Sequence, residues 1–299
     1  MATTKSKRTT RKSSTKPKTA RTAAATKTVG AKSKNPFAGF FARKSDPNEN
    51  ILTVFKTPRI WGAILGEVVG TMLLSILFLS LGFNLIYLIL PMIAIIMATY
   101  ALSGAHLNPL VTVGMMATRR VSAIRGILYI VAQVIGAWFG LLIVNGFRLA
   151  GNSGVELNTM TELTGEIIWH IIFIELIGAM IIGYFFSRAQ SYRSPRGAFT
   201  YAAIVAGGTI LAILFGLVIS GNYLQLENNF AMNPAIAIMY QIFPTSADSF
   251  GALMGGIALA CVTYIIIPMI GGVLGFYLSE ASARLAGECD GPHPHHHHR

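Results

Sequence analysis

Two Asn-Pro dipeptides, at residues 108–109 and 233–234, each interrupt a hydrophobic stretch, and they do so at corresponding places in the two halves of the chain. Asparagine caps the start of helices, and proline lacks a backbone donor but fits the first helical turn. Each dipeptide therefore predicts a short helix that begins inside a hydrophobic layer. Short or proline-interrupted segments at matching points of a repeat are typical of a transport site in a membrane.

Six continuous apolar segments cover residues 61–82, 85–102, 127–147, 167–186, 199–220 and 253–278. At about 1.5 Å per residue, each is long enough to cross all or most of a hydrocarbon core of about 30 Å. Charged residues make up only 12% of the chain, about half of what soluble domains carry. These features predict an all-α membrane protein with six transmembrane helices and two re-entrant half-helices.

Basic residues set the predicted orientation. Arg119, Arg120 and Arg125 precede the third span, and three more arginines lie in the connection between the fourth and fifth spans. The loops expected on the opposite side, 146–166 and 221–248, contain a single basic residue. Because loops rich in Lys and Arg stay on the cytoplasmic side, both termini are predicted to be cytoplasmic.

The chain also carries an internal repeat. The segment 66–70 is echoed by 174–178, and the Ile-Gly and Gly positions of 135–140 are echoed in 270–275. Each half, about 60–147 and 166–279, contains three spans. An odd number of spans makes the second copy enter the membrane from the opposite side, which predicts an inverted repeat whose halves meet at the midplane.

The residues around the dipeptides read SGAHLNPLVT at 103–112 and FAMNPA at 230–235. They resemble the signature of the major intrinsic proteins, the aquaporin and aquaglyceroporin family, and the resemblance extends from about Ile60 to Ser279. It implies a passive homotetrameric channel for water and small uncharged solutes such as glycerol, without a cofactor and without enzymatic activity. The pore motifs are then Asn108, Pro109 and Leu110 in the first half and Asn233, Pro234 and Ala235 in the second, with Leu110 replacing the family's alanine.

Elementary electrostatics supports the same interpretation. Two half-helices that meet at their N-termini direct the positive ends of their dipoles at one point, which repels cations. Asn108 and Asn233 can cap these ends through their oxygens and leave their amide hydrogens free to donate to a passing water or hydroxyl. Such donors fix the orientation of water and interrupt a proton wire.

Four further residues are assigned to holding the re-entrant loops: Glu67, Glu175, His106 and Gln133. The family resemblance implies that the two carboxylates accept hydrogen bonds from the backbone of the loops, since an unpaired charge within a span costs a few kcal/mol or more. The alternative for Glu67 and Glu175 is a side chain that reaches toward the membrane surface. No second ligand is spaced near His106, so no metal site is expected.

The chain departs from the family at the narrow filter, where Ile236 replaces an arginine that usually follows the second Asn-Pro-Ala. Counting back from Asn108 places Leu88 at the filter position of the second span. Alignment of the end of the fifth span places Ile213 at the next filter position, and Phe230 occupies the filter position in the loop. This filter offers no charge and no side-chain donor. Loss of the arginine widens a pore and removes a cation barrier, whereas an apolar constriction can dewet and close.

Two outcomes therefore stay open. We expect passage of small uncharged solutes, with water slower than in a dedicated water channel. The alternative is a closed membrane protein on the same scaffold that acts as a tether or junction through its basic tail. A wide pore for larger or gaseous solutes is a third reading.

Positive charge is concentrated before the first span, where 15 of the 24 Lys and Arg residues lie. Residues 1–50 are predicted to form a disordered basic tail, 51–280 the channel domain and 281–299 a C-terminal tail. The basic tail is expected to lie against the anionic inner leaflet. No base-reading element accompanies it, so nucleic acid is not an expected partner. The terminal histidine run is left out of the functional reasoning, because it could equally be a purification remnant.

Overall fold

The computed structural model describes residues 51–81, 84–152, 167–223, 230–240 and 249–286, which form helices and no strands. All of them belong to one compact unit, Pro36–Arg299; the other unit is Met1–Asn35. The basic tail of residues 1–50 and most of the C-terminal tail predicted from the sequence lie outside the described residues.

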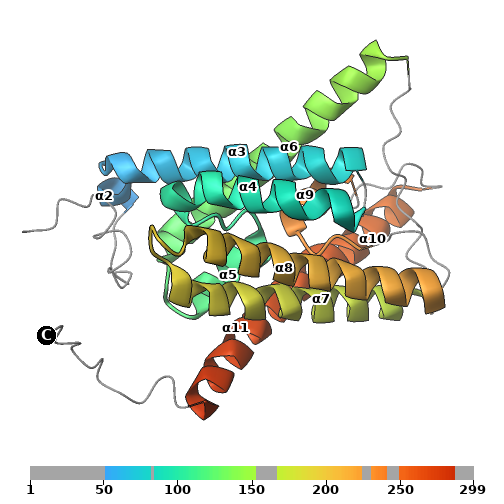
Figure 1. Cartoon of the computed structure of the whole chain (residues 1–299). Helices are drawn as coiled ribbons and strands as arrows, with labels where there is room; N and C mark the ends of the chain where they lie inside the picture. The colour runs from blue at the N-terminus through green and yellow to red at the C-terminus, as the bar shows by residue number, and fades with distance from the viewer. Residues whose placement is uncertain (1–50, 82–83, 153–166, 224–229, 241–248, 287–299) are drawn as a thin grey trace, which may run out of the picture. The chain divides into compact units, whose positions relative to one another are not determined.

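Six helical segments of the described chain are long and apolar enough to cross a membrane (Figure 1). The chain is therefore an integral, multi-pass membrane protein, and the predicted spans are confirmed. A short helix, α2 (Ile51–Phe55), precedes the first of them. The spans are α3 (Pro58–Leu81), α4 (Leu85–Ser103), α6 (Ala123–Ala150), α7 (Ile167–Ala189) with η1 (Gln190–Tyr192), α8 (Ala198–Leu217) with η2 (Val218–Tyr223), and α10 (Phe250–Cys261), which continues through η3 (Val262–Ile266) into α11 (Ile267–Leu285).

The two predicted half-helices are α5 (Pro109–Ala117) and α9 (Pro234–Tyr240). Their nine and seven residues reach about 14 and 11 Å, less than half of a hydrocarbon core. Each begins at its proline, and the preceding asparagine caps it. Asn108 Oδ1 accepts from the Leu110 amide over 3.1 Å, and Asn233 Oδ1 accepts from the Ala235 amide over 3.1 Å.

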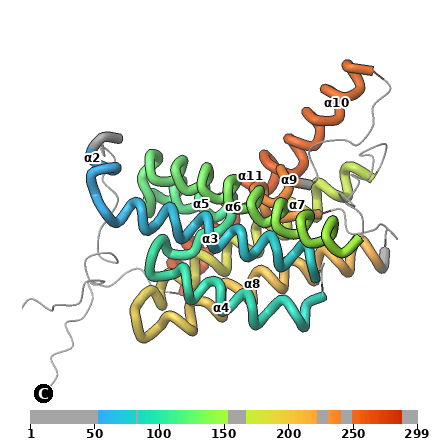
Figure 2. Tube along the Cα trace, turned by 90° about the horizontal axis from the view of Figure 1, so that it is seen from above, coloured from blue at the N-terminus to red at the C-terminus, as the bar shows by residue number. Residues whose placement is uncertain are grey.

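The inverted repeat predicted from the sequence is also confirmed in the packing of the helices. In the first half α3 packs against α4 and α6, and in the second half α7 packs in the same way against α8 and α11 (Figure 2). The half-helices cross over, because α5 packs against α11 of the other half and α9 packs against α6. Each half-helix thus contacts both halves. The two halves also contact each other directly through α4 and α8.

Glycines allow the closest approaches within each half. Small residues four positions apart let the backbones of transmembrane helices come into contact. Such pairs occur at equivalent places on α6 and α11, and each glycine lies against the main chain of the first span of its own half. The approaches are Gly136 to Val68, Gly140 to Met72, Gly271 to Leu176 and Gly275 to Met180.

The sixth span is longer than predicted, since it runs from Phe250 to Leu285 rather than over 253–278. It is not a regular α-helix throughout, because the π-helical segment η3 interrupts it just before Pro268. Proline has no backbone N–H and cannot close the regular i to i−4 bond at this point. A local change of helical register accommodates that missing donor.

We predict that Gly136→Ala destabilises the protein by about 1–3 kcal/mol, because its new methyl group would overlap the Val68 main chain and force α3 away. The matched control is Gly146→Ala in the same helix, where nothing lies within 4 Å of the new methyl group. That control is expected to be neutral or stabilising by about 0.5–1 kcal/mol. Thermal unfolding in detergent measures both, and equal melting temperatures would contradict the close approach.

Candidate functional site

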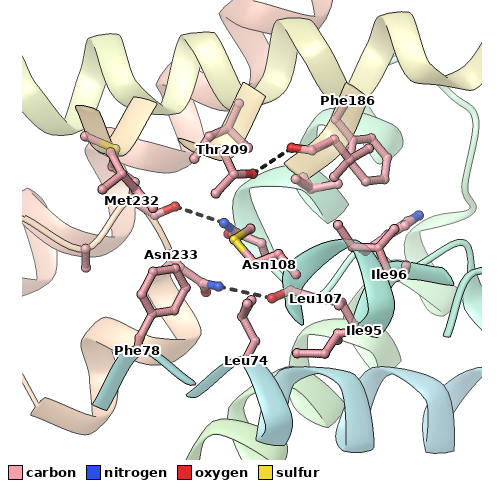
Figure 3. A pocket seen from close by; sticks show the side chains of 18 residues that line it. Leu74, Phe78, Ile95, Ile96, Leu107, Asn108, Phe186, Thr209, Met232 and Asn233 are labelled. Carbon is pink, nitrogen blue, oxygen red and sulfur yellow. Dashed lines mark hydrogen bonds between the residues drawn. The ribbon is translucent and has the colours of Figure 1, made fainter. Parts of the chain in front are cut away.

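The two capping asparagines bind each other's loops. Asn108 Nδ2 donates to the carbonyl oxygen of Met232 over 2.9 Å, and Asn233 Nδ2 donates to the carbonyl oxygen of Leu107 over 3.1 Å. Figure 3 shows this crossed pair of bonds as two dashed lines. Leu107 and Met232 each directly precede the asparagine of their own half, so the same bond is made twice. The N-termini of α5 and α9 are thereby joined head to head.

These bonds change what the asparagines can offer to a passing molecule. A side-chain amide has two hydrogens, and the structure uses one hydrogen of each amide for the other loop. The sequence predicted that the amide hydrogens would be free. Only the second hydrogen of each Nδ2 is left to donate to a molecule beside it.

Leu107 and Met232 adopt left-handed backbone conformations, with φ of 51° and 48°. Such conformations are uncommon for residues other than glycine and cost about 1–3 kcal/mol each. Their side chains occupy the space that a side chain at Gly70 or Gly178 would need. The two glycines of the repeated segments 66–70 and 174–178 therefore make room for the residues that carry the crossed bonds.

Glu67 holds the first loop from the middle of α3. Its Oε1 accepts from the His106 amide over 3.0 Å, and its Oε2 accepts from the Leu107 amide over 2.8 Å. The same Oε2 accepts from Gln133 Nε2 of α6 over 2.6 Å. The carboxylate is fully buried, and three N–H donors surround it.

Glu175 occupies the equivalent position on α7 and is also fully buried. It accepts from the Ala231 amide over 2.5 Å and from the Met232 amide over 3.0 Å at Oε2. Both glutamates therefore bind the residue in the left-handed conformation of their own half, Leu107 or Met232. The strained backbone is stabilised by a charge-assisted hydrogen bond, which is roughly twice as strong as a neutral one.

In the first half, a polar network surrounds the Glu67 carboxylate. Gln133 Nε2 also donates to Thr112 Oγ1 over 2.9 Å, and Nδ1 of His106 lies 3.2 Å from the same hydroxyl. The His106 ring packs edge-on against Tyr129 and Phe186. Its Nε2 is buried and has no hydrogen-bond partner among the described residues. No group of three or more potential metal ligands occurs within the described chain.

A narrow cavity of about 40 Å³ runs past the asparagine pair (Figure 3). On this measure a water needs at least about 10–15 Å³, so only a few molecules fit at once. The wall is mostly apolar. Its four polar residues are His106, Asn108, Thr209 and Asn233, and the apolar ones include Leu74, Phe78, Ile95, Ile96 and Phe186.

The four residues assigned to the filter are all buried in one apolar cluster. Ile213 lines the cavity, whereas Leu88, Phe230 and Ile236 are not among its lining residues. Their exposed fractions are 0%, 1% and 2%, so these three side chains are packed within the protein. Phe230 packs its ring against Gly216 of α8.

Thr209 lines the cavity and was not singled out from the sequence. It lies one helical turn from both Val205 and Ile213, which line the cavity from the same face of α8. The spacing of four residues from the predicted filter position Ile213 could have identified it, because residues four apart share one face of a helix.

Comparison with known proteins identifies the family and the fold of the chain. The model of the family "Major intrinsic protein" matches residues 54–279. The solved structure of the aquaglyceroporin from Plasmodium falciparum superimposes with a TM-score of 0.55 at 18% identity, over 77% of this chain and 99% of that one. At this identity the likeness concerns the fold.

Plant aquaporins are similar to parts of the chain. "Probable aquaporin PIP2-2" of Oryza sativa subsp. japonica is 28% identical over 201 residues, which cover 62% of this chain and 66% of that protein. "Aquaporin PIP2-4" of Zea mays is 36% identical over 109 residues, or 34% of this chain and 36% of that protein. The chain thus spans less than two thirds of the length of these relatives.

We predict that Glu67→Gln destabilises the protein by about 1–3 kcal/mol, because either orientation of the new amide turns its NH₂ group toward a buried N–H donor. The control is Glu280→Gln, which removes the 3.0 Å ion pair with Arg120. Both side chains of that pair are about 30% exposed, so its loss is expected to cost less than about 1 kcal/mol. Thermal unfolding in detergent compares the two; a Glu280 variant that melts as low as the Glu67 variant would argue against the loop-holding bonds.

Proposed function

Because the chain belongs to the major intrinsic protein family, we propose that it forms a passive channel for water and small uncharged solutes such as glycerol. Members of this family are channels, so we propose no enzymatic activity. The observation that carries the proposal is the crossed pair of asparagine bonds beside a narrow cavity. This arrangement offers a permeating molecule two N–H donors at one level of the pore.

The electrostatics of this level favours neutral molecules. The positive ends of α5 and α9 converge where Asn108 and Asn233 meet, and cations are repelled by such ends. Water and hydroxyl groups can accept from the two remaining amide hydrogens. Asn108, Pro109 and Leu110 with Asn233, Pro234 and Ala235 are accordingly proposed as the pore motifs, and Glu67, Glu175, His106 and Gln133 as the residues that hold their loops.

We propose that Leu88, Ile213, Phe230 and Ile236 form an apolar filter. The support is their burial in one cluster together with residues that line the cavity. Such a constriction strips water of its hydrogen bonds and offers none in return, which slows water. A solute with a carbon-bearing face loses fewer hydrogen bonds at this constriction than water does.

The remaining features of the proposal concern the whole chain. The family match at residues 54–279 supports a channel domain at 51–280 between two tails. Six spans place both termini on one side of the membrane, and the basic residues favour the cytoplasmic side. The basic tail is proposed to contact anionic lipid, and a homotetramer follows from the family resemblance.

Stopped-flow swelling of proteoliposomes in glycerol, urea and sucrose tests the proposed channel. We expect glycerol and urea to enter faster than into protein-free liposomes of the same lipid, and sucrose to be excluded. The measurement uses the full chain, with the amount of inserted protein determined for each preparation. Entry of sucrose would point to a wider pore.

A closed scaffold is the alternative function, and the burial of Leu88, Phe230 and Ile236 favours it. In this alternative the chain links membranes or partners through its basic tail and conducts nothing. Equal swelling rates with and without the protein, for water and for every solute, would support it.

We predict that Ile236→Ala increases glycerol permeability by at least about threefold, because it removes bulk from the apolar constriction and lowers a barrier by about 0.7 kcal/mol. Ile171→Ala is the control, since Ile171 is as deeply buried but belongs to a different apolar cluster. Glycerol flux per inserted molecule is compared for the two variants and the unmodified chain. An equal change in both would remove Ile236 from the filter.

A further inference from the structure

We propose that Thr209 is a specificity-determining residue of the pore, whose hydroxyl accepts a hydrogen bond from the permeating solute beside the asparagine pair. This inference rests on the proposed channel function and adds to it a hydroxyl acceptor on α8. It concerns the same cavity, which Thr209 lines from α8. Figure 3 shows Thr209 among the labelled side chains that line the cavity.

The hydroxyl of Thr209 is arranged to accept rather than to donate. Its Oγ1 donates its only hydrogen to the carbonyl oxygen of Val205 over 2.9 Å. A hydroxyl has one hydrogen and two lone pairs, so the lone pairs are what it can offer to a neighbour. Thr209 is half-buried, whereas Val205 and Ile213 on the same face of α8 are buried.

The other polar side chains of the cavity already make bonds within the protein or are buried. The Oδ1 atoms of Asn108 and Asn233 accept the capping bonds of α5 and α9, and their Nδ2 groups are donors. Nε2 of His106 is buried and has no hydrogen-bond partner among the described residues. Thr209 therefore adds a hydroxyl acceptor from α8 to a cavity wall that is otherwise mostly apolar.

The bond from Thr209 to Val205 is also what a threonine with a purely structural role would form. Threonine hydroxyls within helices often bond to the carbonyl four residues back, and Thr99 of α4 does so with Ile95 over 2.9 Å. Thr99 is buried against Gly70 of α3 and is not among the residues that line the cavity. The two threonines thus share their local chemistry and differ in whether the hydroxyl meets the pore, which makes Thr99 a matched control.

Loss of the Thr209 hydroxyl is expected to reduce the permeability of a solute more than that of water. Water molecules that pass in single file can donate to one another, so the loss of one wall acceptor is partly replaced. A polyol in a cavity this narrow has mostly apolar wall around it. One of its hydroxyl groups can accept from an asparagine and donate to Thr209, because all three side chains line the same cavity.

The test compares Thr209→Val, Thr209→Ser and Thr99→Val in proteoliposomes, with glycerol and water permeability measured on the same preparations. Valine keeps the shape of threonine and removes the hydroxyl, whereas serine keeps the hydroxyl. We expect Thr209→Val to lower the ratio of glycerol to water permeability by about two- to tenfold, the effect of one hydrogen bond. Thr209→Ser and Thr99→Val should keep the ratio of the unmodified chain.

Three results would overturn the inference. In the first, Thr209→Val keeps the original ratio. In the second, glycerol and water permeability fall equally, which indicates a structural role. In the third, Thr209→Ser loses as much selectivity as Thr209→Val, which shows that the hydroxyl alone does not set the selectivity. If the unmodified chain carries neither glycerol nor water, the proposed channel function fails first and this inference fails with it.

Discussion

The crossed pair of hydrogen bonds between the two re-entrant loops is the constraint on which the rest of this structure depends. Each bond joins an asparagine side chain of one half to a main-chain carbonyl of the other. The acceptor residues, Leu107 and Met232, are both in left-handed conformations, both bound by a buried glutamate of their own half and both packed over a glycine. The hydrogen bonds of either loop therefore form only when groups of both halves are in place together.

The free-energy cost of starting a helix inside the membrane explains the buried polar residues. Two short helices that begin inside the hydrocarbon core expose backbone N–H groups at their N-termini, and lipid cannot accept hydrogen bonds from them. The asparagine caps and the two buried glutamates supply acceptors for these groups from within the protein. In the proposed pore, the convergent helix dipoles and the remaining amide hydrogens would favour neutral molecules, and the mostly apolar wall would leave few places for a permeating molecule to form hydrogen bonds.

Local sequence signals predicted the spans and the starts of both half-helices, because hydrophobic length and the Asn-Pro dipeptide are properties of short segments. The crossed bonds could not be predicted, since their partners are 124 and 126 residues apart and depend on how the loops meet. The family resemblance assigned Leu88, Phe230 and Ile236 to the filter, yet the folded chain, including the rotation of each helix, decides which side chains face the cavity. The same rotation brings Thr209 to the cavity wall, which apolar patterning along α8 did not reveal.

An experimental density map of the chain in a lipid nanodisc tests this central constraint most directly. We expect α5 and α9 to meet within the hydrocarbon layer, with Nδ2 of Asn108 and Asn233 within hydrogen-bonding distance of the carbonyls of Met232 and Leu107. A map in which either half-helix continues as an unbroken span, lies outside the lipid, or leaves the two asparagines facing away from the opposite loop would contradict it.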